Sequence, residues 1–260
     1  MKRAVLAAVS LFLSIPFTAC ASYDSIEWVP LRSLNLQPEG ATINAVVTNG
    51  AYIYVGGNFT NIGGVNASCV ARWNGTAWEA LGSGLEGRYY QDMNNTWETT
   101  AANVKSMVRD ASGNIYVGGS FGRAGGIEAW GVAKWNGSSW SALPGRGFPC
   151  RWYGNWVPCD YQIVECVQML GNDLYVGGML FNAGDSVGVT NVARLSNNAW
   201  QGVGSGLGRG SAERVYSLGA YGSTIIAGGN FQTNGARTAA CRRLAQWNPG
   251  TPATDWQSFA

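Results

Sequence analysis

Acidic side chains offer the main chemistry in this sequence, because the chain contains no histidine. Five carboxylates lie in or beside two long segments that interrupt an otherwise regular chain: Glu86, Asp92, Glu98, Asp160 and Glu165. A pair of carboxylates on opposite sides of a glycosidic bond can hydrolyse it. These residues are the basis of a hydrolase hypothesis, whose alternative is that they are ordinary solvated surface carboxylates.

The absence of histidine excludes several other chemistries. A Ser-His-Asp triad, a His-ligated zinc or copper site and the usual general base near neutral pH all need an imidazole. No Asp-x-Asp-x-Asp-Gly sequence indicates a calcium loop, and residues 110–114 are typical of a hairpin turn. We therefore expect no metal and no cofactor, and we keep catalysis as the alternative hypothesis.

Aromatic residues are concentrated in the same two segments, residues 86–103 and 148–163. Solvated loops do not need so many rings, and exposed aromatic groups commonly anchor a partner. We predict that these segments bind an extracellular protein or a glycan; packing of the rings on one another, or capping of a central channel, is the competing interpretation. The predicted binding residues are Tyr89, Tyr90, Trp97, Arg151, Trp152, Tyr153, Trp156, Asp160 and Tyr161.

Five cysteines follow the N-terminal leader, so at least one stays free or pairs between molecules. Cys150 and Cys159 lie close together within the second segment and are predicted to form a disulfide. Closing so short a loop would stabilise the fold by roughly 2–3 kcal/mol in the chain-entropy model. Cys69, Cys166 and Cys241 lie in apolar patterns and are predicted to be small buried hydrophobic residues.

The first 21 residues have the features of a secretory signal: two basic residues, an apolar run and then small residues. The apolar run is too short to span a bilayer. Cleavage before Ser22 would release a soluble chain, whereas a lipobox-like sequence ending in Cys20 would leave a lipid anchor on that cysteine. Both outcomes predict a secreted, periplasmic or cell-surface protein, in a compartment where disulfides persist.

The overall charge excludes two classes of partner. The chain has 17 basic and 15 acidic residues, and Lys2 and Arg3 of the leader account for the excess. A neutral chain without a run of Lys or Arg lacks the positive surface that nucleic acids or anionic membranes require. We expect no nucleic-acid partner, and membrane contact only through a possible anchor at Cys20.

Four copies of one pattern must position the two aromatic segments. Each copy has an apolar run that ends in a diglycine, at Gly56, Gly118, Gly177 and Gly228, with a spacing of 51 to 62 residues. Turn residues before that run predict a hairpin, and a third strand, an Asn-Gly or similar turn and a Trp-containing fourth strand follow it. Repeated units of four antiparallel strands predict an all-β β-propeller, either a four-bladed ring or an incomplete, open array.

The domain boundaries follow from these copies. We predict repeats at about residues 43–85, 104–147, 164–207 and 215–260 within a propeller of 41–260, preceded by an N-terminal segment, 22–40, that contains an outer-strand-like element. The first two strands of each copy are apolar on both faces and are predicted to lie between neighbouring sheets. Both aromatic segments connect a fourth strand to the next first strand, so they should project from one end of the propeller.

Recurring residues indicate how the blades pack. The diglycines are predicted to let the backbone bend where no Cβ fits, because the features of a phosphate-binding loop are missing. Trp73, Trp135 and Trp247 recur in the third strand, but the third copy has Leu195 there, so this position needs bulk rather than an indole. A second set of indoles is predicted to pack between blades: Trp78, Trp140, Trp200 and Trp256.

The sequence Tyr-Val-Gly-Gly at 116–119, followed by Val-Ala-Lys-Trp-Asn-Gly at 132–137 and by Trp140, resembles the kelch-type propeller repeat. The resemblance covers about residues 43–260 and is similar in particular to Gly-rich kelch-like repeats of bacterial secreted and surface proteins. It implies four-stranded blades and a binding or scaffolding role more than catalysis. A copper radical oxidase with kelch-type blades would need histidine ligands, which this chain lacks.

Overall fold

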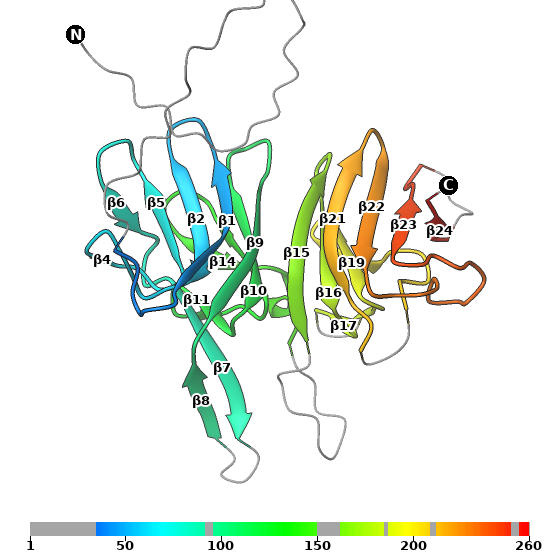
Figure 1. Cartoon of the computed structure of the whole chain (residues 1–260), viewed down its shortest axis with the longest axis horizontal. Coiled ribbons are helices and arrows are strands. Elements are labelled where there is room, and N and C mark those ends of the chain that lie inside the picture. The colour runs from blue at the N-terminus through cyan, green and yellow to red at the C-terminus, as the bar shows by residue number, and fades with distance from the viewer. Residues whose placement is uncertain are drawn as a thin grey trace, which may run out of the picture.

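The computed structural model describes residues 35–91, 96–149, 162–184, 187–208, 212–250 and 255–259; for residues 88–91 and 96–98 it describes the backbone alone. The regular secondary structure of this part of the chain is β-strand apart from one 3-10 turn, η1 (Pro144–Arg146). Four antiparallel sheets of four strands follow one another along the chain (Figure 1). The predicted all-β propeller architecture is confirmed.

Each blade runs from an innermost to an outermost strand in chain order. The first blade contains β1 (Thr42–Thr48), β2 (Ile53–Asn58), β5 (Val70–Trp73) and β6 (Trp78–Ala80). The second contains β9 (Asn103–Arg109), β10 (Ile115–Ser120), β13 (Val132–Trp135) and β14 (Trp140–Ala142). The third contains β15 (Ile163–Leu170), β16 (Asp173–Met179), β19 (Val192–Ser196) and β20 (Ala199–Gly202). The fourth contains β21 (Val215–Tyr221), β22 (Thr224–Gly229), β23 (Leu244–Trp247) and β24 (Gln257–Ser258).

The innermost strands β1, β9, β15 and β21 pack side by side in chain order (Figure 1). Within the described residues the first and fourth blades lie at opposite ends of the row, so the sheets form an open array rather than a closed ring. Tyr216, Tyr221 and Leu244 of the fourth blade are correspondingly exposed.

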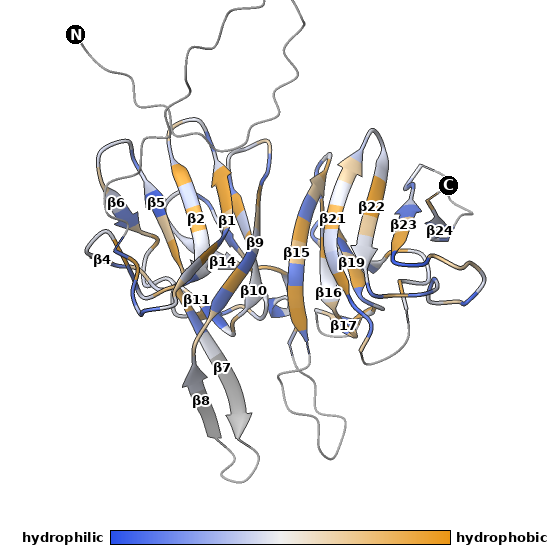
Figure 2. Cartoon of the chain, in the orientation of Figure 1, coloured by the Kyte–Doolittle hydropathy of each residue, from blue (hydrophilic) through white to orange (hydrophobic). Residues whose placement is uncertain are grey.

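Burial differs between the first and second strands of a blade. The second strands of the first three blades are buried along most of their length, as predicted, whereas β22 of the fourth blade is mainly partly buried. Figure 2 shows β2 and β22 as largely hydrophobic but the outer strand β6 as hydrophilic. The prediction that the first strands are also buried on both faces is wrong for β1 and β21 of the end blades, which contain several exposed residues. In the middle blades, β15 has no exposed residue and β9 has one, at its end. Within the described residues, each end blade of the open array has a neighbouring blade on one side only.

The diglycines show why no side chain fits at the ends of the second strands. A Cβ on the first glycine would crowd the next blade: at Gly118 it would lie 2.8 Å from side-chain atoms of both Val164 and Val167. A Cβ on the second glycine, as at Gly178, would collide with the carbonyl oxygen of Ile163 in the same blade. The predicted structural role of the diglycines is therefore confirmed, since each pair allows two close approaches.

The two sets of tryptophans differ in their hydrogen bonds. Trp135 of the third-strand set is buried, and its Nε1 has no hydrogen-bond partner. That agrees with a leucine, Leu195, in the same place in the third blade. Indoles of the fourth-strand set instead donate to a carbonyl of the preceding blade, as Trp140 does to Leu81 at 2.7 Å and Trp256 does to Val203 at 2.8 Å.

One strand pair was not predicted. Residues 86–103 were interpreted as a connecting insertion, but they contain most of β7 (Leu85–Gln91) and all of β8 (Thr96–Thr100), a hairpin that projects from one end of the array (Figure 1). The hairpin joins β11 (Arg123–Ala124) and β12 (Ile127–Glu128) in a further four-stranded sheet. The corresponding short pairs in blades one and three are β3 (Asn61–Ile62) with β4 (Val65–Asn66), and β17 (Asn182–Ala183) with β18 (Val187–Gly188).

Candidate binding surface at the insertion end

We call the end from which the hairpin projects the insertion end, because the feet of both aromatic segments lie there. The β7–β8 hairpin is attached by pairing between Glu86 and Arg123 and by the Gly122 N–H, which donates to the Glu86 carbonyl at 2.9 Å. Gly87 faces Thr100 across the hairpin, and a Cβ there would lie 2.6 Å from the Ala101 carbonyl oxygen. Gly87 is therefore needed where β7 and β8 leave the blades, because a side chain does not fit there.

Gln162 anchors the foot of the second segment with both ends of its amide. Its Nε2 donates to the carbonyls of Phe148 at 3.4 Å and Pro149 at 3.0 Å, which lie on the other side of the segment. Its Oε1 accepts from the backbone N–H groups of Phe181 at 3.0 Å and Asn182 at 3.1 Å, in the loop after the third diglycine. The segment therefore begins and ends at one fixed point, at the end that the loops after the diglycines share, as predicted.

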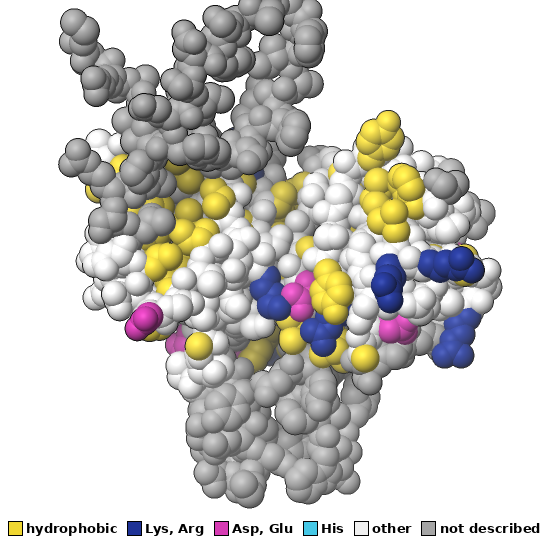
Figure 3. Space-filling view, in the orientation of Figure 1, with side chains coloured by type: hydrophobic (Ala, Val, Ile, Leu, Met, Phe, Trp, Pro, Cys, Tyr) yellow, Lys and Arg dark blue, Asp and Glu magenta, His cyan; other side chains and the backbone are white. Residues whose placement is uncertain are grey.

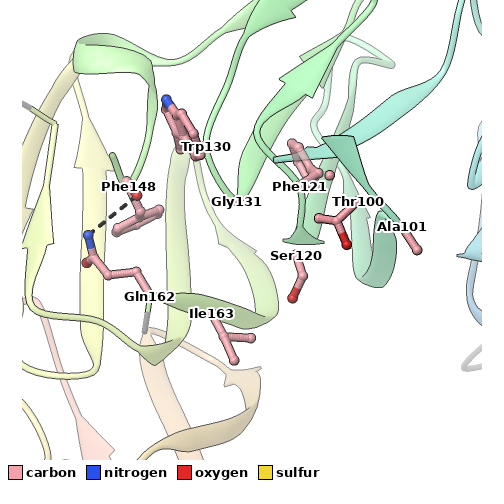
Figure 4. A pocket seen from close by; sticks show the side chains of 10 residues that line it. Thr100, Ala101, Ser120, Phe121, Trp130, Gly131, Phe148, Gln162 and Ile163 are labelled. Carbon is pink, nitrogen blue, oxygen red and sulfur yellow. Dashed lines mark hydrogen bonds between the residues drawn. The ribbon is translucent and has the colours of Figure 1, made fainter. Parts of the chain in front are cut away.

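A pocket of about 270 Å³ lies between the two feet (Figure 4). Both feet contribute to its wall, together with the end of β10 and the start of β13. Its lining residues are all uncharged: Gly87, Thr100, Ala101, Ser120, Phe121, Trp130, Gly131, Phe148, Gln162 and Ile163. Aromatic walls with a few hydroxyl and amide groups are typical of sites that hold an uncharged group.

The inner strands also contribute a row of side chains from β-bulges. Each inner strand has a register irregularity near its start, and the unpaired residues are Asn44, Lys105, Glu165 and Tyr216. Three of these side chains bridge neighbouring inner strands: Asn44 Nδ2 donates to Asn103 Oδ1 at 2.8 Å, and Lys105 Nζ lies 2.6 Å from Glu165 Oε2. The bulges thereby direct polar groups into the space between blades.

Glu165 lies between two cations. Its second oxygen is 3.4 Å from Arg214 Nη1, and its side chain is 12% exposed, against 28% for Lys105 and 27% for Arg214. Figure 3 shows basic and acidic side chains next to one another on the side of the molecule that faces the viewer in Figure 1. Glu165 therefore forms ion pairs with both Lys105 and Arg214. The sequence did not reveal this cluster, since its three members come from different repeats.

Most predicted site residues have no described side chain. Tyr89, Tyr90 and Trp97 belong to β7 and β8, of which the backbone is described there. The remaining predicted residues lie outside the described residues: Arg151, Trp152, Tyr153, Trp156, Asp160, Tyr161, Cys150, Cys159, Cys20 and the outer-strand-like element of the N-terminal segment. The structure brings together the feet of the segments that carry them, and these predictions otherwise remain predictions.

The other three cysteines are buried, as predicted, and the structure shows them free. Burial raises the pKa of the thiols of Cys69, Cys166 and Cys241 above the ordinary value. Cys69 Sγ also contacts the Ala102 carbonyl oxygen at 3.1 Å. Raised thiol pKa values disfavour the reactive thiolate, so these residues act as packing groups.

The described residues contain no cluster of three or more potential metal ligands. Among them, no helix is long and apolar enough to cross a membrane.

No protein-family description matches the chain, and no curated protein matches it. Solved structures with some similarity include YCF48 bound to D1 peptide, at 12% identity and a TM-score of 0.33 over 87% of this chain and 69% of that chain. Bacteroides ovatus xyloglucan PUL GH43B is 12% identical with a TM-score of 0.34, over 83% of this chain and 40% of that chain. The computationally designed Ika8 protein is 10% identical with a TM-score of 0.27, over 83% of this chain and 74% of that chain. At these scores the similarity adds nothing to the architecture, which rests on the blades themselves.

Proposed function

We propose that this protein is an extracellular binding or scaffold module with kelch-type blades, which engages a protein or glycan partner at its insertion end. The observation that carries the proposal is the pocket between the feet of the two aromatic segments, whose described lining residues are all uncharged. Binding sites commonly combine an apolar wall with few polar groups. The pocket also borders the segments in which we predict the binding aromatics.

The same pocket is poorly suited to hydrolysis. Glycoside hydrolysis needs two carboxyl groups beside the scissile bond, one of them able to donate a proton. None of the described lining residues has a carboxyl group, and Glu165, two residues after the lining residue Ile163, forms ion pairs with Lys105 and Arg214. A hydrolase would have to use other candidate carboxylates, such as Glu98 and Asp160.

A matched pair of substitutions tests the proposed site. Ala101 is exposed at the pocket, so Ala101→Phe should fill the pocket without disturbing the core. Ala111 is exposed in the turn between β9 and β10, at the other end of the same blade, so Ala111→Phe is the control. We expect saturable binding on a glycan or peptide array that Ala101→Phe abolishes and Ala111→Phe retains.

Two results would contradict this proposal. Turnover in a panel of glycoside hydrolase substrates that disappears in Glu98→Gln or Asp160→Asn would assign an enzyme. Binding that Ala101→Phe leaves unchanged would place the site elsewhere.

We further propose that the loop between Cys150 and Cys159 is the main recognition element. A disulfide lowers the entropy lost when a partner immobilises a loop, and rigid aromatic rings add contact area at low rotamer cost. Replacing Trp152 and Trp156 with alanine should abolish binding and leave the melting temperature nearly unchanged. A large fall in stability with binding retained would show that these rings cap the array instead.

A further inference from the structure

Strand β8 is the outermost strand of the hairpin sheet. Among the described residues it pairs only with β7, across five consecutive residue pairs from Gly87–Thr100 to Gln91–Thr96. In an antiparallel strand, alternate residues direct their N–H and C=O groups to opposite edges. The free edge of β8 therefore presents backbone donors and acceptors to whatever lies beside it, and such an edge can template another extended chain.

Other edge strands of the described blades have protective features that β8 lacks. Each inner strand, such as β9, is interrupted by a bulge, and the outer strands β6, β14, β20 and β24 are two to four residues long. Bulges and short lengths are common ways to prevent pairing at an edge. β8 has five residues, no register shift against β7, and no proline or lysine in its sequence Thr-Trp-Glu-Thr-Thr.

The uncharged pocket lies at the foot of this edge. Thr100 is the last residue of β8, and Thr100 and Ala101 both line the pocket. An extended chain paired with β8 and continuing past Thr100 therefore reaches the pocket mouth. The buried rings of Phe121 and Phe148 in the wall favour an apolar, uncharged side chain there.

The charged side chains Lys105, Glu165 and Arg214 add a second basis for ligand selectivity. Lys105 follows closely after Asn103, which pairs with the pocket residue Ser120, and Glu165 follows closely after the pocket residue Ile163. Lys105 and Arg214 together outweigh the single carboxylate of Glu165. Their partly exposed positive charge complements an acidic group on a ligand that passes the pocket.

We infer that β8 pairs with an extended peptide segment of a partner protein, which inserts an apolar side chain into the pocket and places an acidic residue near Lys105. This inference rests on the proposed function and narrows its partner from a protein or glycan to an extended peptide. Backbone pairing supplies affinity that does not depend on sequence, and the pocket and the positive charge supply specificity.

A random linear peptide library, displayed on phage and selected on the mature protein, is the probe. We expect recovered peptides to combine β-branched residues, one large apolar residue and an acidic residue. Their affinity should fall roughly tenfold or more in Ala101→Phe and stay unchanged in Ala111→Phe. Failure to recover any peptide, or equal binding by both variants, would overturn the inference.

Hydrogen exchange on the unsubstituted protein tests the strand pairing directly. A selected peptide should slow exchange of amides in β8, because the free-edge N–H groups become hydrogen-bonded. Protection elsewhere, with none in β8, would show that the edge is not used. Dimerisation of the free protein with protection of β8, measured by analytical ultracentrifugation and exchange, would assign the edge to a second copy instead.

Glycan binding separates the two proposals. If glycans bind and Ala101→Phe blocks them while no peptide protects β8, the proposed binding function stands and the peptide inference is wrong. If neither glycans nor peptides bind at the pocket, both are wrong.

Discussion

The interfaces between blades and the insertion end of this molecule are built on different principles. Each interface repeats the same contacts: a first glycine makes room for a side chain of the next inner strand, and a fourth-strand indole donates to the preceding blade. The insertion end instead depends on individual contacts, such as the four hydrogen bonds of Gln162. Repeated contacts should determine stability, whereas the individual contacts position a surface that can vary without loss of the fold.

The largest loss of stability is expected at a repeated contact that leaves no space for a Cβ atom. In Gly178→Ala the new Cβ would collide with the Ile163 carbonyl oxygen, so either the inner strand or the blade must move. We expect a loss of roughly 4 kcal/mol or more in the free energy of unfolding, measured by urea denaturation.

Gly219→Ala is the matched control, because a Cβ at Gly219 meets no atom within 4 Å. Its free energy of unfolding should change by less than about 0.5 kcal/mol. Equal unfolding midpoints for Gly178→Ala and Gly219→Ala would contradict the role assigned to the diglycine.

The second prediction separates the two sets of tryptophans. Trp135→Ala should cost roughly 3–5 kcal/mol through lost burial and a residual cavity. Trp140→Phe should cost about 1 kcal/mol more than Trp135→Phe, because only Trp140 loses a hydrogen bond, the one to Leu81. Thermal unfolding of the four proteins measures this difference; an unchanged melting temperature in Trp135→Ala would show that the blade assignment is wrong.

A smaller loss of stability is expected when the ion pairs of Glu165 with Lys105 and Arg214 are removed. Glu165→Gln leaves Lys105 and Arg214 facing each other in a partly buried place and should lower the free energy of unfolding by roughly 1–3 kcal/mol. The control is Glu128→Gln, whose partner Arg146 is 59% exposed, so the change should be close to zero. Similar losses in both variants would mean that burial does not distinguish the two ion pairs.

The smallest expected effect is a pH dependence of stability that comes from the buried thiols. Burial raises the pKa of Cys166 above that of the unfolded chain, so the folded state binds more protons than the unfolded state once the pH exceeds the unfolded pKa. The contribution of this thiol to stability should be constant below about pH 8 and should fall as the pH rises beyond the ordinary thiol pKa. Urea denaturation between pH 7 and pH 10 should show this decline in the wild type and a smaller decline in Cys166→Ala.

The repeat period and the local turn residues were enough to predict the blades. Hairpin turns such as residues 110–114 and the diglycines depend on backbone conformation within a few residues, and such preferences are visible in the sequence. The interchange of Trp135 and Leu195 likewise showed that bulk alone was needed, as the unpaired Nε1 of Trp135 confirms. Hydrophobicity also predicted correctly that Cys69 and Cys241 are buried.

The hairpin β7–β8 had a local signal that the interpretation missed. Aromatic and β-branched residues stand on both sides of Met93-Asn-Asn, which is typical of a strand pair around a turn. The fourth copy has Asn234 where the second copy has Ala124. Asn234 is buried, and its Nδ2 donates to Asp255 Oδ2 at 3.0 Å and to Thr238 Oγ1 at 2.8 Å, so a polar network fixes this loop.

The sequence by itself therefore determined the blade, its strand order and the residues that need to be small or bulky, because these depend on contacts that recur at a constant spacing. Only the tertiary structure decided that the array is open, that the feet of two distant segments enclose an uncharged pocket, and that Lys105, Glu165 and Arg214 meet. Those contacts join residues from different repeats through bulges and loop anchors, and no local pattern in the chain records how far neighbouring blades rotate or which bulged side chains face each other.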